Sequence, residues 1–331
     1  MKIAILGGGS WGSTLANVLS DNGHQCLIYE RDEKRANDIN RYHLHPFFEN
    51  TYLNEDIQAT ANLDDALVYS DYLLIAVPSH AIRRLFKEIN NKINNKKFFI
   101  NVAKGIEPDT LKTVSEIFKE EISEDKSLGF VTLSGPSHAE EVILRKLTLL
   151  VAASDNLDEA ILVQNLFSNQ DYIRVYTSID LKGVEVGGSI KNAIALISGV
   201  LTGLGLGENA RAALISRGIY EIVQITIAMG GKKDTVFGLS GIGDLIVTAS
   251  STNSRNFNAG FKIGQGMSIE EAVNSSKMVV EGARVIKSGH QIAKAYHLDL
   301  PIIETAYLVL YQGFDVKDGI KNLMNRQLKS E

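Results

Sequence analysis

The chain has 331 residues, of which 44% are hydrophobic and 22% charged, a composition typical of a globular protein with room for two domains. Its formal net charge of −5 at pH 7, without long basic runs, excludes a general electrostatic attraction to nucleic acid or to an anionic membrane surface. The one cysteine, Cys26, excludes an intrachain disulfide and a thiolate zinc site, and agrees with a cytoplasmic location.

The chain opens with MKIAILGGG, whose apolar run is too short for a signal peptide, so we interpret it as a first strand. The uncharged run at residues 192–207 is shorter than the ~20 residues that a membrane-spanning helix needs. We therefore expect a buried helix there and no integral membrane segment.

Short β-rich runs alternate with helical patterns up to about residue 176. The predicted strands are residues 2–6, 25–30, 72–77, 97–102, 129–133, 147–153 and 171–176. Apolar strands separated by helices predict a parallel sheet covered on both faces. After about Asp180 the strand signals stop and helical periodicity continues. We predict an α/β Rossmann-type nucleotide-binding domain over residues 1–180 and an all-α substrate and catalytic domain over residues 181–331.

The first strand runs directly into GGGSWG, and a helical pattern follows. This order predicts a dinucleotide site, because the glycines allow a tight turn, close approach of the pyrophosphate, and packing of helix against strand. A glycine-rich loop without a ligand is the alternative. Ser10 and Trp11 fall at this turn, where capping and packing are their alternative roles. The three glycines of the motif are Gly7, Gly9 and Gly12.

Two charged residues at the end of the second predicted strand bear on cofactor choice. Glu30 is placed to bind the adenosine ribose hydroxyls and to repel a 2′-phosphate, which favours NAD. Arg31 beside it points the other way, because a guanidinium can pair with that phosphate. The sequence thus predicts NAD or NADP, with a preference for NAD.

Further charged groups follow strand and helix ends. Lys104 follows a predicted strand directly, where open α/β sheets bind ligands, although a surface lysine is the alternative. Asp244 precedes an apolar run and needs a cation, for which Lys191 is the best candidate. Arg255 and Asn256 together suit a phosphate or a carboxylate.

Histidines offer weaker signals. His138, in SGPSHAEE, is an acid–base candidate without a carboxylate partner at fixed spacing, so a role at a helix start is favoured. His43 and His45, in YHLHP, have no cysteine or acid cluster nearby. We expect them in a solvent-exposed loop and predict no metal site.

Seven ordered segments carry a resemblance. GGGSWG, KGIEPD, SGPSHAEE, GVEVGGSIKNAIAL, GLSGIGDLIVT, SRNFNAG and VVEGA occur in this order, at similar spacing, in bacterial NAD(P)-dependent glycerol-3-phosphate dehydrogenases. The chain resembles that family from Lys2 to about Asn325. The resemblance implies the interconversion of dihydroxyacetone phosphate and sn-glycerol 3-phosphate, a small phosphate substrate, by hydride transfer with NAD(P)H. It also implies a homodimer and a supply of glycerol 3-phosphate for phospholipid synthesis.

The resemblance further implies roles for individual residues. Lys191 matches the catalytic lysine, and we expect Lys104 and Asp244 to assist it. The residues that match substrate contacts are Lys104, Gly135, Ser137, Lys191, Asp244, Ser254, Arg255 and Asn256. Those that match cofactor contacts are Ser10, Trp11, Arg31, Lys104, Ala139, Arg255, Val279 and Glu281. Glu30 stands at a position that is often uncharged in the family.

Two other readings remain open from the residues. One is a different member of the wider group of two-domain β-hydroxyacid-type dehydrogenases, since Arg255 would also suit a carboxylate substrate. The other is a non-catalytic dinucleotide sensor, which would have no need for Lys104, Lys191 and Asp244 together.

Overall fold

The computed structural model describes residues 1–275, 280–328 and 330. The chain divides into two units, one formed by residues 1–104 and 112–185 and the other by residues 105–111 and 186–331. The segment that follows Lys104 therefore belongs to the second unit, although the chain on both sides of it belongs to the first.

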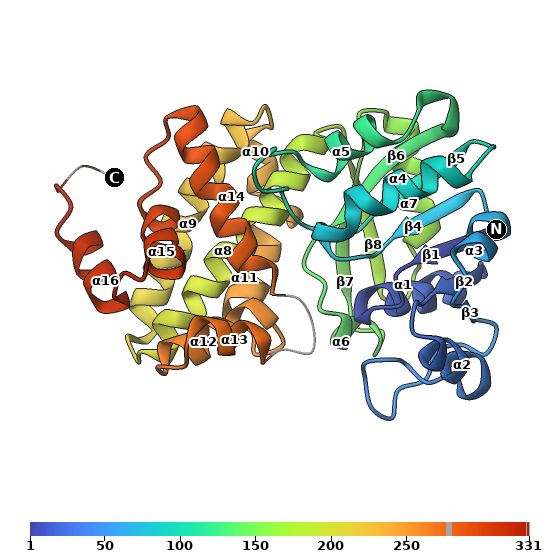
Figure 1. The fold of residues 1–331 in the computed structure, drawn as a ribbon, viewed down its shortest axis with the longest axis horizontal. Helices are drawn as coiled ribbons and strands as arrows, with labels where there is room; N and C mark the ends of the chain where they lie inside the picture. The colour runs from blue at the N-terminus through green and yellow to red at the C-terminus, as the bar shows by residue number, and fades with distance from the viewer. Residues whose placement is uncertain (276–279, 329, 331) are drawn as a thin grey trace. The chain divides into compact units, whose positions relative to one another are not determined.

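The first unit is built on an eight-stranded sheet in the order β3-β2-β1-β4-β5-β6-β7-β8 (Figure 1). Its strands are β1 (Lys2–Leu6), β2 (Gln25–Tyr29), β3 (Gln58–Thr60), β4 (Tyr72–Ile75), β5 (Lys97–Asn101), β6 (Ser127–Ser134), β7 (Thr148–Ala153) and β8 (Ile173–Ser178). The chain order reverses at β1, which lies between β2 and β4. A crevice at such a point is where open α/β sheets bind dinucleotides.

The sheet departs from the prediction in two places. Strand β3 was not predicted, because three residues, Gln58, Ala59 and Thr60, are too few to show an alternating pattern. Strands β6 and β7 pair antiparallel, whereas every other pair is parallel. The connection between them holds only the one-turn helix α6 (Ala139–Val142), which is too short to cross over the sheet and restart in parallel.

Helices cover both faces of this sheet, as its apolar strands require. One face packs against α1 (Ser10–Asp21), α2 (Glu33–Tyr42) and α7 (Leu157–Phe167), and the other against α3 (Leu63–Tyr69), α4 (Ile82–Lys92) and α5 (Val114–Glu121). Short 3₁₀ turns lie at η1 (Ser79–Ala81) and η2 (Glu124–Lys126).

Helix α8 (Leu181–Gly203) begins in the first unit and continues into the second. Its length and composition would allow it to span a membrane, but 89% of its most apolar window is buried inside the protein. That burial is typical of a core helix. The expectation of a buried helix over residues 192–207 holds as far as the end of α8 at Gly203, whereas residues 205–207 are exposed.

The described part of the second unit is helical (Figure 1). Its remaining elements are α9 (Gly207–Ala228), α10 (Lys233–Val236), the π-helical turn η3 (Leu239–Gly243), α11 (Asp244–Ser250), α12 (Arg255–Gly264), α13 (Ile269–Asn274), α14 (Glu281–Tyr296), α15 (Pro301–Gln312) and α16 (Val316–Met324). Its core gathers aliphatic side chains from α8, α9, α14 and α15, including Ile194, Ile222, Ile286 and Ile303.

Glu221 is a buried carboxylate within this core. It accepts hydrogen bonds from the backbone N–H groups of Ile302 (2.6 Å) and Ile303 (3.0 Å), in the first turn of α15. Those N–H groups have no partner inside their own helix, so Glu221 satisfies them from α9.

Glu221 should make the protein less stable as the pH rises from about 4.5 to about 7. Burial raises the pKa of its carboxyl from 4.5 to about 7. The folded state then binds the proton more tightly than the unfolded chain, and the free energy of unfolding falls across this window. Glu221→Gln should flatten the pH dependence by up to about 3 kcal/mol. Urea unfolding at pH 5 and pH 8 gives the free energy of unfolding of the wild type and the variant at each pH. The same change with pH in both proteins would contradict the prediction.

Candidate active site

The glycine turn after β1 leaves a cradle for a phosphate. Gly7 has a φ of +125°, and a Cβ atom added to it would lie 2.7 Å from the carbonyl oxygen of Ala76. A Cβ atom on Gly12 would overlap the carbonyl oxygen of Gly7. On Gly9, in contrast, a Cβ atom would meet nothing within 4 Å. The turn is therefore packed tightly at its first and third glycines and open at the second, which fits a bound dinucleotide.

The first turn of α1 follows Gly9 and is fixed by a buried histidine. Ser10 is buried, Trp11 is half-buried against the core, and Thr14 donates a hydrogen bond to the Ser10 carbonyl at 2.8 Å. Nε2 of His45 lies 3.3 Å from the Thr14 hydroxyl.

The expectation of an exposed loop is wrong for His45, which is only 4% exposed. Its Nδ1 accepts hydrogen bonds from the backbone N–H groups of Phe47 and Phe48, and its ring stacks on Phe48. Burial lowers the pKa of His45 to about 4, so the ring is neutral near pH 7. His43 is half-buried at the end of α2. In the described chain, no cluster of three His, Cys, Asp or Glu side chains is arranged to hold a metal ion.

Glu30 lies against the glycine turn. Its carboxylate accepts a hydrogen bond from the backbone N–H of Asp32 at 3.0 Å, and a Cβ atom on Gly8 would lie 2.6 Å from its Oε2. Glu30 is 9% exposed, whereas Arg31 is exposed. The negative charge is thus held in place beside the turn, while the positive charge next to it extends into solvent.

Lys104 lies at the carboxyl end of the sheet in the first unit. Its Nζ donates a hydrogen bond to the carbonyl oxygen of Gly135 at 3.2 Å, and the Ser137 hydroxyl donates to the same oxygen at 3.0 Å. Gly135 has a φ of +134°. His138 precedes α6 as its N-terminal cap residue, and Ala139 is the first residue of that helix. The ends of β5 and β6 therefore bring Lys104, Gly135 and Ser137 together.

Lys191 and Asp244 form a buried ion pair in the second unit. Nζ of Lys191 lies 2.7 Å from Oδ1 of Asp244, and the two side chains are 6% and 3% exposed. The pairing expected between them is present. A third residue, Thr248, accepts a hydrogen bond from the same Nζ at 2.6 Å and donates one to the Asp244 carbonyl at 2.5 Å.

Thr248 was missed from the sequence because its segment was treated only as an apolar run. The structure shows a helix, α11, in which Asp244 and Thr248 are four residues apart and lie on one face. A helical interpretation of DLIVT would have indicated this pair.

Asn256 is held by two side-chain hydrogen bonds. Its Nδ2 donates to Oδ1 of Asn192 at 3.0 Å, and its Oδ1 accepts from the backbone N–H of Gly282 at 2.8 Å. Ser254 caps α12 by accepting from the Phe257 N–H, and Arg255 is the first residue of that helix. Asn256 therefore ties the helix of Lys191 to the starts of α12 and α14.

The predicted residues fall into two groups that follow the units. The first unit holds Gly7, Gly9, Ser10, Trp11, Gly12, Glu30, Arg31, Lys104, Gly135, Ser137 and Ala139, and the second holds Lys191, Asp244, Ser254, Arg255, Asn256 and Glu281. Glu281 begins α14. Val279 lies outside the described residues.

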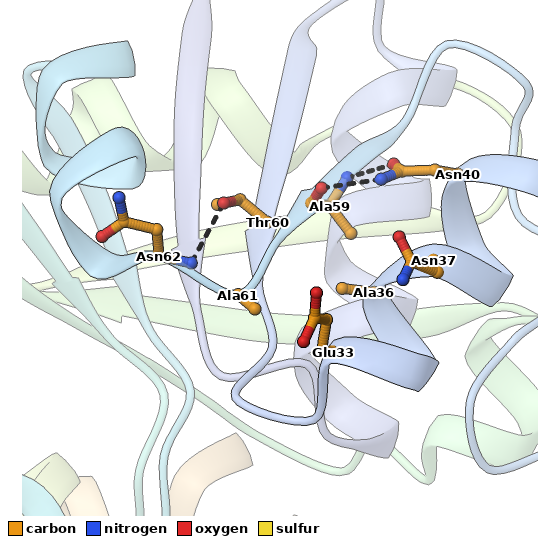
Figure 2. Close-up of a pocket in the computed structure, with 8 residues that line it drawn as sticks. All are labelled: Glu33, Ala36, Asn37, Asn40, Ala59, Thr60, Ala61 and Asn62. Carbon is orange, nitrogen blue, oxygen red and sulfur yellow. Dashed lines mark hydrogen bonds between the residues drawn. The ribbon is translucent and has the colours of Figure 1, made fainter.

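A cavity of about 480 Å³ lies elsewhere, between α2 and β3 (Figure 2). Asn40 reaches from α2 to both backbone groups of Ala59, at 2.9 Å to its carbonyl oxygen and 2.7 Å to its nitrogen. This side chain satisfies backbone groups at the edge of β3. None of the predicted site residues lines the cavity, so the predicted chemistry does not depend on it.

Comparison with known proteins gives consistent results across both units. A family model described as the NAD-dependent glycerol-3-phosphate dehydrogenase N-terminus matches residues 2–160, and the corresponding C-terminus model matches residues 180–321. A glycerol-3-phosphate dehydrogenase (NAD(P)+) of Acholeplasma laidlawii is 56% identical over 331 residues, covering 100% of this chain and 99% of that protein. One of Macrococcus caseolyticus is 44% identical over 332 residues and covers 100% of both.

The chain is a member of the NAD-dependent glycerol-3-phosphate dehydrogenase family. The crystal structure of glycerol-3-phosphate dehydrogenase from Coxiella burnetii superposes with a TM-score of 0.92 at 30% identity, covering 98% of this chain and 99% of that one. The predicted family, the fold class of a Rossmann-type domain followed by a helical one, and the use of NAD or NADP are thereby confirmed. The protein is an NAD(P)-dependent oxidoreductase that interconverts dihydroxyacetone phosphate and sn-glycerol 3-phosphate, a general source of the phospholipid backbone.

Proposed function

We propose that Lys191 is the catalytic acid–base group of this dehydrogenase, and its buried ion pair with Asp244 is the observation that carries the proposal. NADH or NADPH, when bound, supplies the hydride that adds to the ketone carbon of dihydroxyacetone phosphate. Negative charge then grows on the carbonyl oxygen, where the Lys191 ammonium stabilises it and donates a proton. In the oxidation direction the neutral amine takes the proton back from the alcohol.

Asp244 and Thr248 support this role by orienting the ammonium group. Both accept hydrogen bonds from Nζ, at 2.7 and 2.6 Å, and α11 holds them both. A group that is oriented before the reaction does not have to reorganise during it, so its charge acts more strongly on the transition state than on the ground state.

The start of α12 is the proposed site for the substrate phosphate. Arg255 is the first residue of this helix, at an end where the N-terminal backbone N–H groups and the helix dipole also favour an anion. We assign Asn256, with its side chain tied to Asn192 and Gly282, to holding this turn in place. Binding of the phosphate at a distance from the reacting carbon would orient the ketone for hydride transfer.

The first unit supplies the cofactor cradle and a second lysine. The open space at Gly9 fits the pyrophosphate, and Lys104, beside Gly135 and Ser137, is proposed to hold the substrate.

The proposed roles of Lys191 and Arg255 predict different kinetic effects: loss of Lys191 should affect kcat, and loss of Arg255 should affect KM. Lys191→Ala should lower kcat by ~10²–10⁴-fold, because one positioned acid is lost, while NADH still binds. Arg255→Ala should chiefly raise the KM for dihydroxyacetone phosphate, because binding contacts to the phosphate are lost. Steady-state assays of NADH oxidation, with NADH binding followed by fluorescence, measure both. Near-normal turnover of Lys191→Ala, or an unchanged KM in Arg255→Ala, would refute the corresponding role.

We also propose that the enzyme prefers NADH. The Glu30 carboxylate is held beside the glycine turn by the Asp32 N–H, where it would meet the 2′-phosphate of NADPH with a like charge. The wild type should therefore have a higher kcat/KM with NADH than with NADPH. Glu30→Gln keeps an acceptor for the Asp32 N–H but removes the charge, and should narrow the difference about tenfold. A wild-type preference for NADPH would rule out this role for Glu30.

A cytoplasmic homodimer is the proposed assembly. Tyr220 and Ile227 are 54% and 53% exposed on α9, seven residues apart and so on one face of the helix. Apolar side chains on one helix face suit an interface between two copies of the chain. Sedimentation equilibrium should give twice the 36.3 kDa mass of the chain, and Tyr220→Glu should shift the protein towards monomer. A wild-type monomer would contradict the proposal.

A further inference from the structure

Residues 105–111, here called the strap, pack into the second unit. Ile106 is 2% exposed and belongs to the apolar core of that unit, together with Ile286 of α14. Its carbonyl oxygen accepts a hydrogen bond from the hydroxyl of Ser288, a fully buried residue of α14, at 2.9 Å. The second residue after Lys104 is thus fixed through both its side chain and its backbone.

A second anchor holds the strap at Asp109. Its backbone N–H donates to Oε1 of Gln291 at 3.0 Å, and Nε2 of Gln291 donates to Oδ1 of Asp109 at 2.8 Å. Lys287 forms an ion pair with the same carboxylate at 3.2 Å. Hydrogen bonds from Gln291 and Lys287 lower the pKa of Asp109, so it is ionised near neutral pH. Lys287, Ser288 and Gln291 lie on one face of α14.

The backbone of the strap is held in a strained shape. Asp109 and Leu111 have φ values of +70° and +59°, in a region that a leucine rarely adopts. The Leu111 N–H closes a turn onto the Glu107 carbonyl at 2.9 Å. Such conformations persist only where surrounding contacts impose them, and they gather at functional sites. The contacts from α14 are of that kind.

Lys104 directly precedes this anchored segment. Its side chain donates to Gly135 in the first unit, while the backbone that follows it belongs to the second unit. We propose that α14 anchors the strap in order to fix the backbone after Lys104, which makes Ser288 and Gln291 positioning residues for substrate binding by Lys104. The inference rests on the proposed role of Lys104 in holding the substrate.

The test has two steps: a single variant breaks the side-chain hydrogen bond between Gln291 and Asp109, and a double variant restores it with donor and acceptor exchanged. Gln291→Glu keeps an acceptor for the Asp109 N–H but sets two carboxylates against each other. It should raise the KM for dihydroxyacetone phosphate about tenfold, with kcat within about twofold, because positioning and not chemistry is disturbed. Hydrogen exchange in the peptide that covers residues 105–111 should become faster.

Gln291→Glu combined with Asp109→Asn should restore both readouts, because the new amide can donate to the new carboxylate. Asparagine also tolerates the left-handed backbone of this position. The double variant loses the ion pair between Asp109 and Lys287, but ion pairs between such exposed side chains contribute little to stability. Lys294→Ala, at an exposed position in the last turn of α14, is the matched control and should behave as the wild type.

The outcomes separate the inference from the proposed function. The inference would be overturned if Gln291→Glu changed neither the hydrogen exchange of residues 105–111 nor the KM for dihydroxyacetone phosphate, or changed only one of them. It would also be overturned if the double variant did not recover the wild-type values of both. If Lys104→Ala leaves the KM unchanged, the proposed role of Lys104 fails and the inference fails with it, whereas the exchange data still report whether α14 anchors the strap.

Discussion

The buried ion pair between Lys191 and Asp244 is the interaction on which the rest of the second unit depends. Taking two charges out of water is costly, and their mutual attraction offsets that cost only where the geometry is good and further hydrogen bonds are made. Here the distance is 2.7 Å and Thr248 supplies the further bond. Removing either partner would leave an uncompensated buried charge, so the pair constrains α8 and α11 together.

Buried polar side chains elsewhere in the largely apolar helix α8 also need partners. Glu185, in the second turn of α8, is buried and accepts hydrogen bonds from the N–H (3.0 Å) and hydroxyl (2.5 Å) of Ser115 and from the hydroxyl of Thr132 (3.1 Å). Burial raises its pKa. Two turns later, Asn192 is satisfied by Asn256. Each polar side chain of α8 named here therefore has a partner on another element, which ties the helix to α5, β6, α11 and α12.

The sequence was informative where local pattern and chemistry coincide. The strand, turn and helix around Gly7 follow from one short segment, because Gly7 and Gly12 are required by the close approach of neighbouring backbone. Strand β3 could not be predicted in this way because three residues are too few to show a pattern. The burial of His45 could not be predicted either, since it depends on contact with Thr14, which is 31 residues away in the chain. The strap is hidden for the same reason: Asp109 and Gln291 are 182 residues apart.

Close backbone contact between α8 and α12 explains how the proposed catalytic and phosphate-binding groups keep a fixed spacing. A Cβ atom on Gly203 of α8 would lie 3.0 Å from the Cα atom of Gly264 in α12, and one on Gly264 would lie 2.9 Å from the Cα atom of Gly203. One turn earlier, Gly199 and Gly260 meet the backbone of the opposite helix in the same way.

With no side chains between them at these points, the two helices have little freedom to slide or to separate. Lys191 lies on one helix and Arg255 on the other, so main-chain contact sets the offset between the backbone positions of the proposed proton donor and the proposed phosphate-binding residue. Long side chains alone would leave each group several rotamers. A backbone-defined spacing instead suits a substrate whose ketone and phosphate are themselves a fixed number of bonds apart.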